Sequence, residues 1–151
     1  MQIRIEASDL PGSSCAPGGG APDGYHGVYV GVQRRNKRGE LLGLVAGDAP
    51  SATWDLDCKA VPGQDGADLS GRYIQGPPGG RFIYLSWVTV DEAGSSTLFR
   101  RAKLWLDAVP PAVIDMAQRS GLIVGRLGLT DAKGNPRCAS VRPPVVQWSA
   151  E

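Results

Sequence analysis

The sequence has one histidine, His26, and three cysteines among its 151 residues. A single histidine confines Ser-His-Asp and Cys-His catalysis to His26, which we expect in a glycine-rich loop. Cys15, Cys58 and Cys138 are odd in number and widely spaced, which is typical of reduced thiols rather than of a disulfide framework. With His26 they have the ligand types of a Cys3His zinc site. No two cysteines have the two-to-four-residue spacing of such a site, so we predict neither a metal site nor a cofactor.

Charge of one sign and long apolar runs are also scarce. Sixteen lysines and arginines against fifteen acids leave a net charge of +1, so no whole-molecule field attracts nucleic acid, and we predict no nucleic-acid partner. No apolar run approaches the roughly 18 residues that cross a bilayer, so we predict no membrane partner. Residues 1–6 alternate between apolar and polar and lack the apolar stretch of a signal peptide. We therefore expect a cytoplasmic protein.

The common catalytic signatures are missing as well. The sequence contains no G-x-x-x-x-G-K-[ST] phosphate loop, no G-x-G-x-x-G ahead of a helix, no H-E-x-x-H, no G-x-S-x-G and no C-x-x-C. Nucleotide-dependent, zincin, α/β-hydrolase and thioredoxin-like interpretations therefore receive no support from motifs.

Glycine and proline are abundant, at 21 and 12 residues, and they favour turns and short strands over helices. Period-two alternation recurs at Ile3 and Ile5 and along residues 28–33, and it predicts half-buried strands. The alternation is cleanest over 53–61, which we predict as one unbroken strand. Residues 71–75 are predicted as a short edge strand, and the stretch 82–90, apolar on both faces, as a central strand.

One short helix is predicted near residues 111–119, where Pro111 suits a first turn and Gly121 suits the position just past the end. A strand over 137–141 and a last one over 145–148 complete the pattern. We predict an all-β fold, a mainly antiparallel sandwich or barrel of eight to ten short strands with this one helix, in a single globular domain over 1–151.

Arginines in or beside apolar strand segments are the most informative candidates, because a guanidinium there needs a partner or a cavity. Together with nearby aromatic residues they predict an apolar small-molecule pocket with a few polar anchors. The predicted ligand-binding residues are Arg81, Tyr84, Trp87, Arg100, Trp105 and Arg126. Arg100 shares strand parity with Leu104 and is expected to face inward. The alternative is that these arginines reach the rim of the protein or pair with Asp57 and Asp107.

Two other groups of polar residues are weaker candidates for a functional site. Asp55 and Asp57 lie on one face of a predicted strand and, like His26, would serve an acid/base enzyme, although Lys59 would offset their charge. The basic run 34–38 has no interleaved aromatic residue and is interpreted as a solvated hairpin turn.

Three stretches resemble a family of small single-domain bacterial proteins that is described only as a domain of unknown function. They are Gly76–Trp87, Phe99–Leu104 and Gly125–Pro136, and the resemblance extends over nearly the whole chain. It implies a compact intracellular protein and assigns no activity to any residue.

The function predicted best is small-molecule binding by a β-rich domain, as an accessory or cyclase-like factor without covalent catalysis. The alternative is a protein-interaction module that works as a homodimer, because short, proline-broken strands leave sheet edges to be covered.

Overall fold

Ten strands and one helix make up the described part of the chain. The structure, a computed structural model, describes residues 1–10, 25–37, 40–47, 49–63, 66–91, 93, 96–129 and 144–151. The elements are β1 (Gln2–Ser8), β2 (Tyr25–Gln33), β3 (Leu41–Ala46), β4 (Ser51–Asp57), β5 (Lys59–Gly63), β6 (Gly66–Ser70), β7 (Phe82–Asp91), β8 (Ser96–Trp105), α1 (Pro111–Ser120), β9 (Leu122–Gly128) and β10 (Gln147–Ala150). The predicted strand over 137–141 lies outside the described residues.

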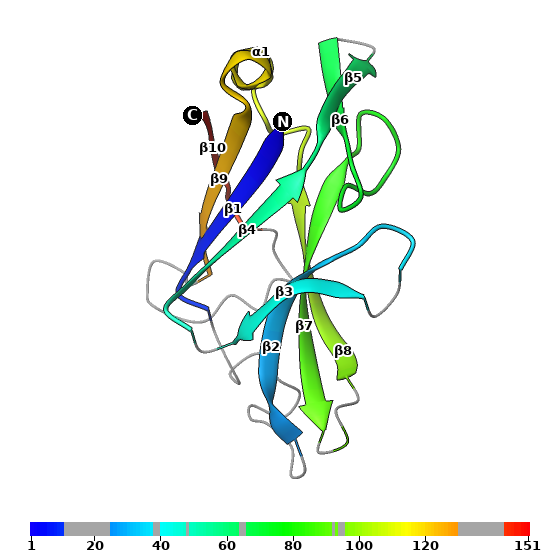
Figure 1. Cartoon of the computed structure of the whole chain (residues 1–151), viewed down its shortest axis with the longest axis vertical. Helices are drawn as coiled ribbons and strands as arrows, with labels where there is room; N and C mark the ends of the chain where they lie inside the picture. The colour runs from blue at the N-terminus through cyan, green and yellow to red at the C-terminus, as the bar shows by residue number, and fades with distance from the viewer. Residues whose placement is uncertain are drawn as a thin grey trace.

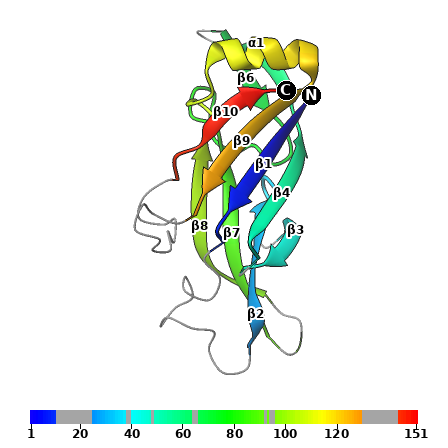
Figure 2. The same ribbon diagram turned by 90° about the vertical axis from the view of Figure 1, so that its left-hand side faces the viewer.

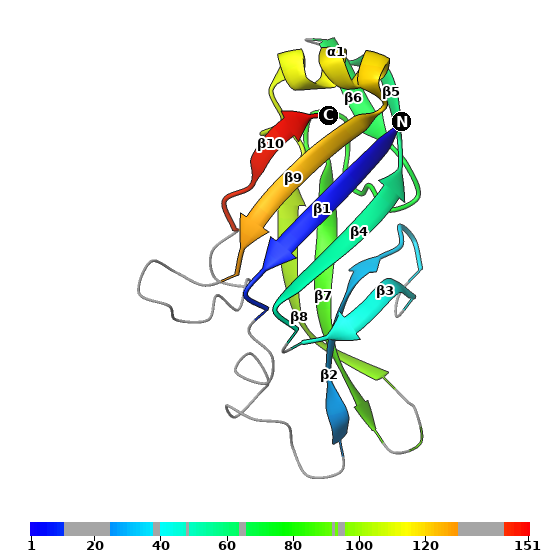
Figure 3. The ribbon, with the colours of Figure 1, turned by 60° about the vertical axis from the view of Figure 1, so that its left-hand side comes forward.

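The strands form two four-stranded sheets and a two-stranded ribbon (Figure 1). The first sheet has the order β10–β9–β1–β4, and within it β1 and β9 run parallel. The second sheet has the order β3–β2–β7–β8 and is antiparallel throughout. The ribbon pairs β5 with β6. The first sheet lies obliquely across the second, as Figure 3 shows. The predicted all-β class is confirmed, and the sheets are not closed into a barrel.

Apolar residues at every second position join the two sheets in one core. On β1 and β4 the alternation buries Ile3, Ile5, Trp54 and Leu56 and leaves the residues between them more exposed. The second sheet contributes Val30, Val32, Ile83, Leu85, Trp87, Ala102 and Leu104 to the same buried cluster. The predicted central position of 82–90 is confirmed, because β7 lies between β2 and β8. Each sheet therefore turns one face to this core, and on the opposite faces Val124 of the first sheet and Val88 of the second are buried as well.

The single predicted helix is confirmed as α1. Pro111 opens it, and Gly121 ends it in the left-handed conformation with φ +92°, donating its backbone N–H to Ala117 O at 2.7 Å. The helix buries Ile114 and Ala117 and lies across one end of the first sheet (Figure 2). Among the described residues, no helix has the length and apolarity needed to cross a membrane.

The prediction of one unbroken strand over 53–61 is wrong. β4 ends at Asp57, and the chain enters the ribbon at Lys59. The break lies opposite the start of β1, where Gln2 pairs with Asp57 and the Cys58 N–H donates to the carbonyl of Met1. Beyond that point β4 has no partner in the first sheet, so residues 59–63 pair with β6 instead.

The segment after the ribbon also differs from its prediction. Residues 71–75 form a turn rather than an edge strand, and Gln75 alone pairs, through one bridge to Phe82. The sequence pattern also missed β6, because residues 66–70 contain glycine and aspartate, which are rare in strands.

The edges of the two sheets meet through Trp54. Its indole Nε1 donates to the carbonyl of Gly43 at 2.8 Å and links β4 to β3, while only 3% of the residue is exposed. Gly43 has φ +63°, in the left-handed region, and a Cβ there would lie 2.7 Å from Trp54 Cδ1. Glycine at this position therefore satisfies both the backbone conformation and the close approach of the ring.

We expect Gly43→Ala to lower the free energy of unfolding by about 2–4 kcal/mol, from left-handed strain together with displacement of Trp54. The matched control is Gly79→Ala, because Gly79 has φ +77° and a Cβ added there would meet no atom within 4 Å. It should lose only the conformational part, about 1–2 kcal/mol. Urea denaturation of both variants measures the difference, and equal losses would show that Trp54 moves aside at no cost.

Candidate functional site

The six predicted ligand-binding residues do not converge on one pocket. Arg126 lies on the outer face of the first sheet, Arg81 precedes β7, Trp87 and Arg100 are on the core side of the second sheet, and Tyr84 and Trp105 are on its outer face. The surroundings of each place decide what its residues can bind.

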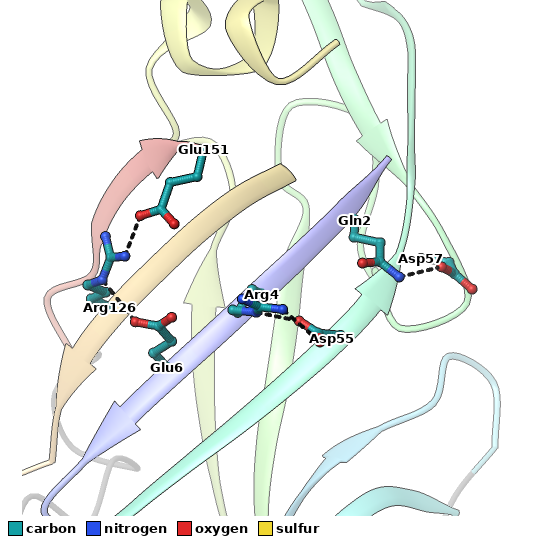
Figure 4. A network of polar contacts seen from close by, with 7 residues as sticks. All are labelled: Gln2, Arg4, Glu6, Asp55, Asp57, Arg126 and Glu151. Carbon is teal, nitrogen blue, oxygen red and sulfur yellow. Dashed lines mark hydrogen bonds and ion pairs between the residues drawn. The ribbon is translucent and has the colours of Figure 1, made fainter. Parts of the chain in front are cut away.

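On the first sheet, Arg126 is held by acidic partners (Figure 4). Its Nε lies 2.9 Å from Glu6 Oε2, its Nη1 donates to Ser149 Oγ at 3.1 Å, and its Nη2 contacts the Glu151 carboxylate. The contact with Glu151, more than any other, raises the pKa of Arg126 above its usual range. An open groove of about 700 Å³ lies beside this network and is lined in part by Glu6 and Arg126. Arg126 has its counter-charges in place, which indicates a structural role.

Asp55 and Asp57, the carboxylate pair on β4, are likewise hydrogen-bonded to neighbouring side chains. Arg4 donates from Nε to Asp55 Oδ1 at 2.8 Å and from Nη2 to Oδ2 at 3.2 Å, and Gln2 Nε2 donates to Asp57 Oδ1 at 3.4 Å. The hydrogen bonds from Arg4 hold the pKa of the Asp55 carboxyl below its usual range. A carboxylate that is ionised at neutral pH and already bonded is a poor general acid. The side chain of His26 lies outside the described residues.

Trp87 and Arg100 face each other across β7 and β8. Trp87 is completely buried, and its indole Nε1 has no hydrogen-bond partner within the described ranges. Arg100 is half-buried and shares the core side of β8 with Ala102 and Leu104, as strand parity predicts. A register shift between Trp87 and Val88, which the sequence did not indicate, lies beside this pair.

Arg81 is satisfied by protein groups other than the predicted Asp57 and Asp107. Its Nε lies 3.3 Å from Asp68 Oδ2, and its Nη1 donates to the carbonyl of Gly76 at 2.9 Å. Asp68 Oδ1 in turn accepts the backbone N–H of Leu69 at 2.9 Å. A cavity of about 560 Å³ lies beside Asp68, between the ribbon, residues 78–79 and the segment 106–114. Its lining is largely apolar, and Asp68 is already paired.

The outer face of the second sheet brings rings and cations together. We call the five residues Phe82, Tyr84, Arg101, Lys103 and Trp105 the cationic–aromatic face. Strand register sets them in rows, since Phe82 pairs with Trp105, Tyr84 with Lys103, and Ser86 with Arg101, and directly opposed residues point to the same side of a sheet. Of the predicted residues, this face unites Tyr84 and Trp105.

The rings of this face surround Lys103. Its Nζ lies 4.4 Å from the ring centroid of Phe82, 5.0 Å from that of Trp105 and 5.8 Å from that of Tyr84. The guanidinium carbon of Arg101 lies 5.0 Å from the centroid of Tyr84. The Phe82 ring meets its two aromatic neighbours edge to face, at 4.8 Å from Tyr84 and 5.4 Å from Trp105. Both cations thus lie within cation–π distance of ring faces.

The cationic–aromatic face has more positive charge and more hydrogen-bond donors than the described residues around it can pair. Neither Arg101 nor Lys103 has a carboxylate within 4.0 Å in the described part of the chain. Arg101 Nε is buried and has no hydrogen-bond partner there, and the same holds for Gln75 Nε2. Gln75 pairs with Phe82 on the side away from Trp105, so it extends the first row of the face.

The predicted ligand-binding residues did not include Phe82, Arg101, Lys103 or Gln75. A signal for the first three exists, because residues 101, 103 and 105 alternate on one strand and residues 82 and 84 on the next. Only the register between β7 and β8 brings the two sets together.

Cys58 is the one cysteine within the described residues, and it is half-buried with a free thiol. Burial raises the pKa of the Cys58 thiol to about 11. The thiol is therefore protonated at neutral pH and is a weak nucleophile. Among the described residues, no group of three or more histidine, cysteine or acidic side chains is placed to hold a metal ion.

We expect iodoacetamide to modify Cys58 at pH 8 about 100-fold more slowly in the folded protein than in urea, because the thiolate is the reactive form. The rate in the folded protein should rise about tenfold per pH unit up to pH 10, since the pKa lies higher, at about 11. Peptide mass spectrometry separates Cys58 from Cys15 and Cys138. Equal rates for folded and unfolded chains at pH 8 would contradict the raised pKa.

Comparison with known proteins identifies a family. Nothing matches the chain among curated proteins or among solved structures. A family model described as a family of unknown function (DUF5990) matches residues 1–151, which include all three stretches that carry the resemblance noted from the sequence. The chain therefore belongs to the family of unknown function DUF5990.

Proposed function

We propose that this protein binds a small molecule and that the cationic–aromatic face is its binding site. One observation carries the proposal. Two cations, Arg101 and Lys103, lie over three aromatic rings without a carboxylate partner in the described residues, and a buried nitrogen of Arg101 lacks an acceptor.

The energetics favour a ligand over a purely structural role. A buried donor without an acceptor costs about 1–3 kcal/mol, and stacking a cation on an exposed ring returns about 0.5–1 kcal/mol. A structural cluster of this kind would gain from an acidic residue, as Arg126 gains from Glu6 and Glu151. A bound anion would supply the negative charge that Arg101 and Lys103 lack within the described residues.

The groove on the first sheet and the cavity beside Asp68 are weaker candidates. The groove on the first sheet passes Arg126, whose partners are in place, and the cavity beside Asp68 has a carboxylate that Arg81 and the Leu69 N–H already occupy. The cationic–aromatic face combines apolar contact area with unpaired donors, which is the usual composition of a ligand site.

The groups on this face bind and orient rather than attack. Rings, a guanidinium and an ammonium ion can hold a flat substrate in one conformation, so we assign the protein an accessory or cyclase-like role without a covalent intermediate. The free thiol of Cys58 is consistent with a reducing compartment, and we place this function in the cytoplasm.

The first test is a metabolite library followed by thermal shift and tryptophan fluorescence. We expect a stabilising ligand whose affinity falls at least about tenfold in Lys103→Met, because the ammonium ion is lost. The matched control is Lys59→Met, at an exposed strand position away from the face, which should bind as the wild type does. A library without a stabilising compound, or equal binding by both variants, would overturn the proposal.

A second candidate function is a homodimer, and the exposed edge strand β3 favours it. Residues 41–46 contain no charge, and Leu42 and Leu44 are 40% and 47% exposed. An uncharged apolar edge is a common site of strand pairing or apolar contact between copies.

If β3 joins two copies, light scattering should give twice the mass of the chain for the wild type and the single mass for Leu44→Lys, because the added charges would be buried together. Met116→Lys, at an apolar side chain on α1 that is 51% exposed, is the matched control and should remain dimeric. A monomeric wild type at high concentration would rule out this function.

A further inference from the structure

The cationic–aromatic face has a definite layout. Its two cations, Arg101 and Lys103, are at alternate positions of β8. Its rings lie on β7 and at the end of β8. Arg101 and Lys103 are two residues apart, so their backbones are about 7 Å apart. The row of Gln75, Phe82 and Trp105 lies four residues along β7 from the row of Ser86 and Arg101, which is about 13 Å. Because the cationic side chains of the protein are long and reach over the face, a ligand of two or three fused rings is long enough to contact both rows.

From this layout we infer that the ligand is a planar aromatic acid, a fused ring system with a carboxylate or a phosphate at one end. The inference rests on the proposed function of this face and narrows its substrate class. It follows from two features of the face, which are its charge and its flat rings.

Charge selects an anion. Two like charges two residues apart on one strand repel each other, and within the described ranges neither has an acid within 4.0 Å. A guanidinium presents its N–H groups as a planar fork that matches the two oxygens of a carboxylate or phosphate. An anion at the Arg101 guanidinium would offset both positive charges, whereas a neutral ligand would not.

The rings select a flat molecule. Trp105 is 36% exposed, and the edge-to-face packing of Phe82 against Tyr84 and Trp105 turns ring faces toward the cations rather than toward one another. A planar aromatic ring can stack on an indole while its acid group meets the fork of a guanidinium. A saturated ring of equal size lacks the flat π face and would make fewer contacts.

Single-stranded nucleic acid also binds surfaces that combine cations and rings. The neighbouring positions on this face are uncharged, since Gly31 and Ser86 continue the row of Arg101 toward β2. A protein with a net charge of +1 likewise lacks the long-range positive field that attracts a polyanion. The observations therefore favour a small acid, and an oligonucleotide becomes an outcome of the test.

The test uses the intact protein, isothermal titration calorimetry and a matched set of probes. 2-Naphthoate and 2-naphthyl phosphate supply the planar acid with either anionic group. 2-Naphthamide keeps the ring without the charge, and decalin-2-carboxylate keeps the charge without the planarity. Decathymidylate represents single-stranded nucleic acid. We expect at least one of the two naphthyl acids to bind, and the amide and the saturated acid to bind at least about tenfold more weakly.

Arg101→Lys locates the site, because lysine keeps the charge and loses the planar fork. We expect it to weaken naphthoate binding at least about tenfold. Arg119→Lys, on the exposed end of α1, should have no effect. The melting temperature of each variant checks folding, and the probe series with the wild-type protein stays decisive if Arg101→Lys does not fold.

The outcomes separate the two proposals. Equal binding of naphthoate and naphthamide, or no probe binding while the library yields another ligand at this face, would overturn the planar acid and leave small-molecule binding intact. Decathymidylate binding more tightly than either naphthyl acid would also overturn it. Failure of the probes and of the library together would overturn both. Naphthyl phosphate binding without naphthoate would support the inference and assign phosphate as the anion.

Discussion

Burial of one apolar face on each sheet is the constraint on which the rest of this structure depends. Ile3, Ile5 and Trp54 project from the first sheet into the same cluster as Val30 and Leu85 from the second. Neither four-stranded sheet could leave such a face in water without losing most of the hydrophobic driving force for folding. Because the inner faces are committed to each other, any ligand chemistry must lie on the outer faces, at the edges or at the ends.

Both outer faces carry cations, but the groups around those cations differ. On the first sheet every described arginine has an acid, as Arg4 has Asp55 and Arg126 has Glu6 and Glu151. On the second sheet Arg101 and Lys103 lie over rings, and no described acid is near them. The first arrangement is complete within the protein. The second lacks acceptors and negative charge, which is why we place function there.

Strand parity places the aromatic residues predicted to bind a ligand on opposite faces of the second sheet. Trp87 belongs to the inner face of β7 and Tyr84 to the outer face, so no single cavity can contain both. Arg126 pairs with Glu6, 120 residues away in the sequence, and Arg81 pairs with Asp68, 13 residues away. Residue types alone indicated that arginines would need partners, and they did not indicate which partners would be close.

Local sequence determined the elements whose signals are local. The alternation of Ile3 and Ile5 predicts a strand, and the proline at position 111 with the glycine at 121 predicts the helix, because these depend on side-chain periodicity and backbone freedom within a few residues. Tertiary structure decided what depends on a partner. The break at Cys58 follows from where β1 begins, the β6 strand from its pairing with β5, and the cationic–aromatic face from the register of β7 against β8. Pairing between distant segments is set by the burial of both sheets at once, and no local pattern contains that information.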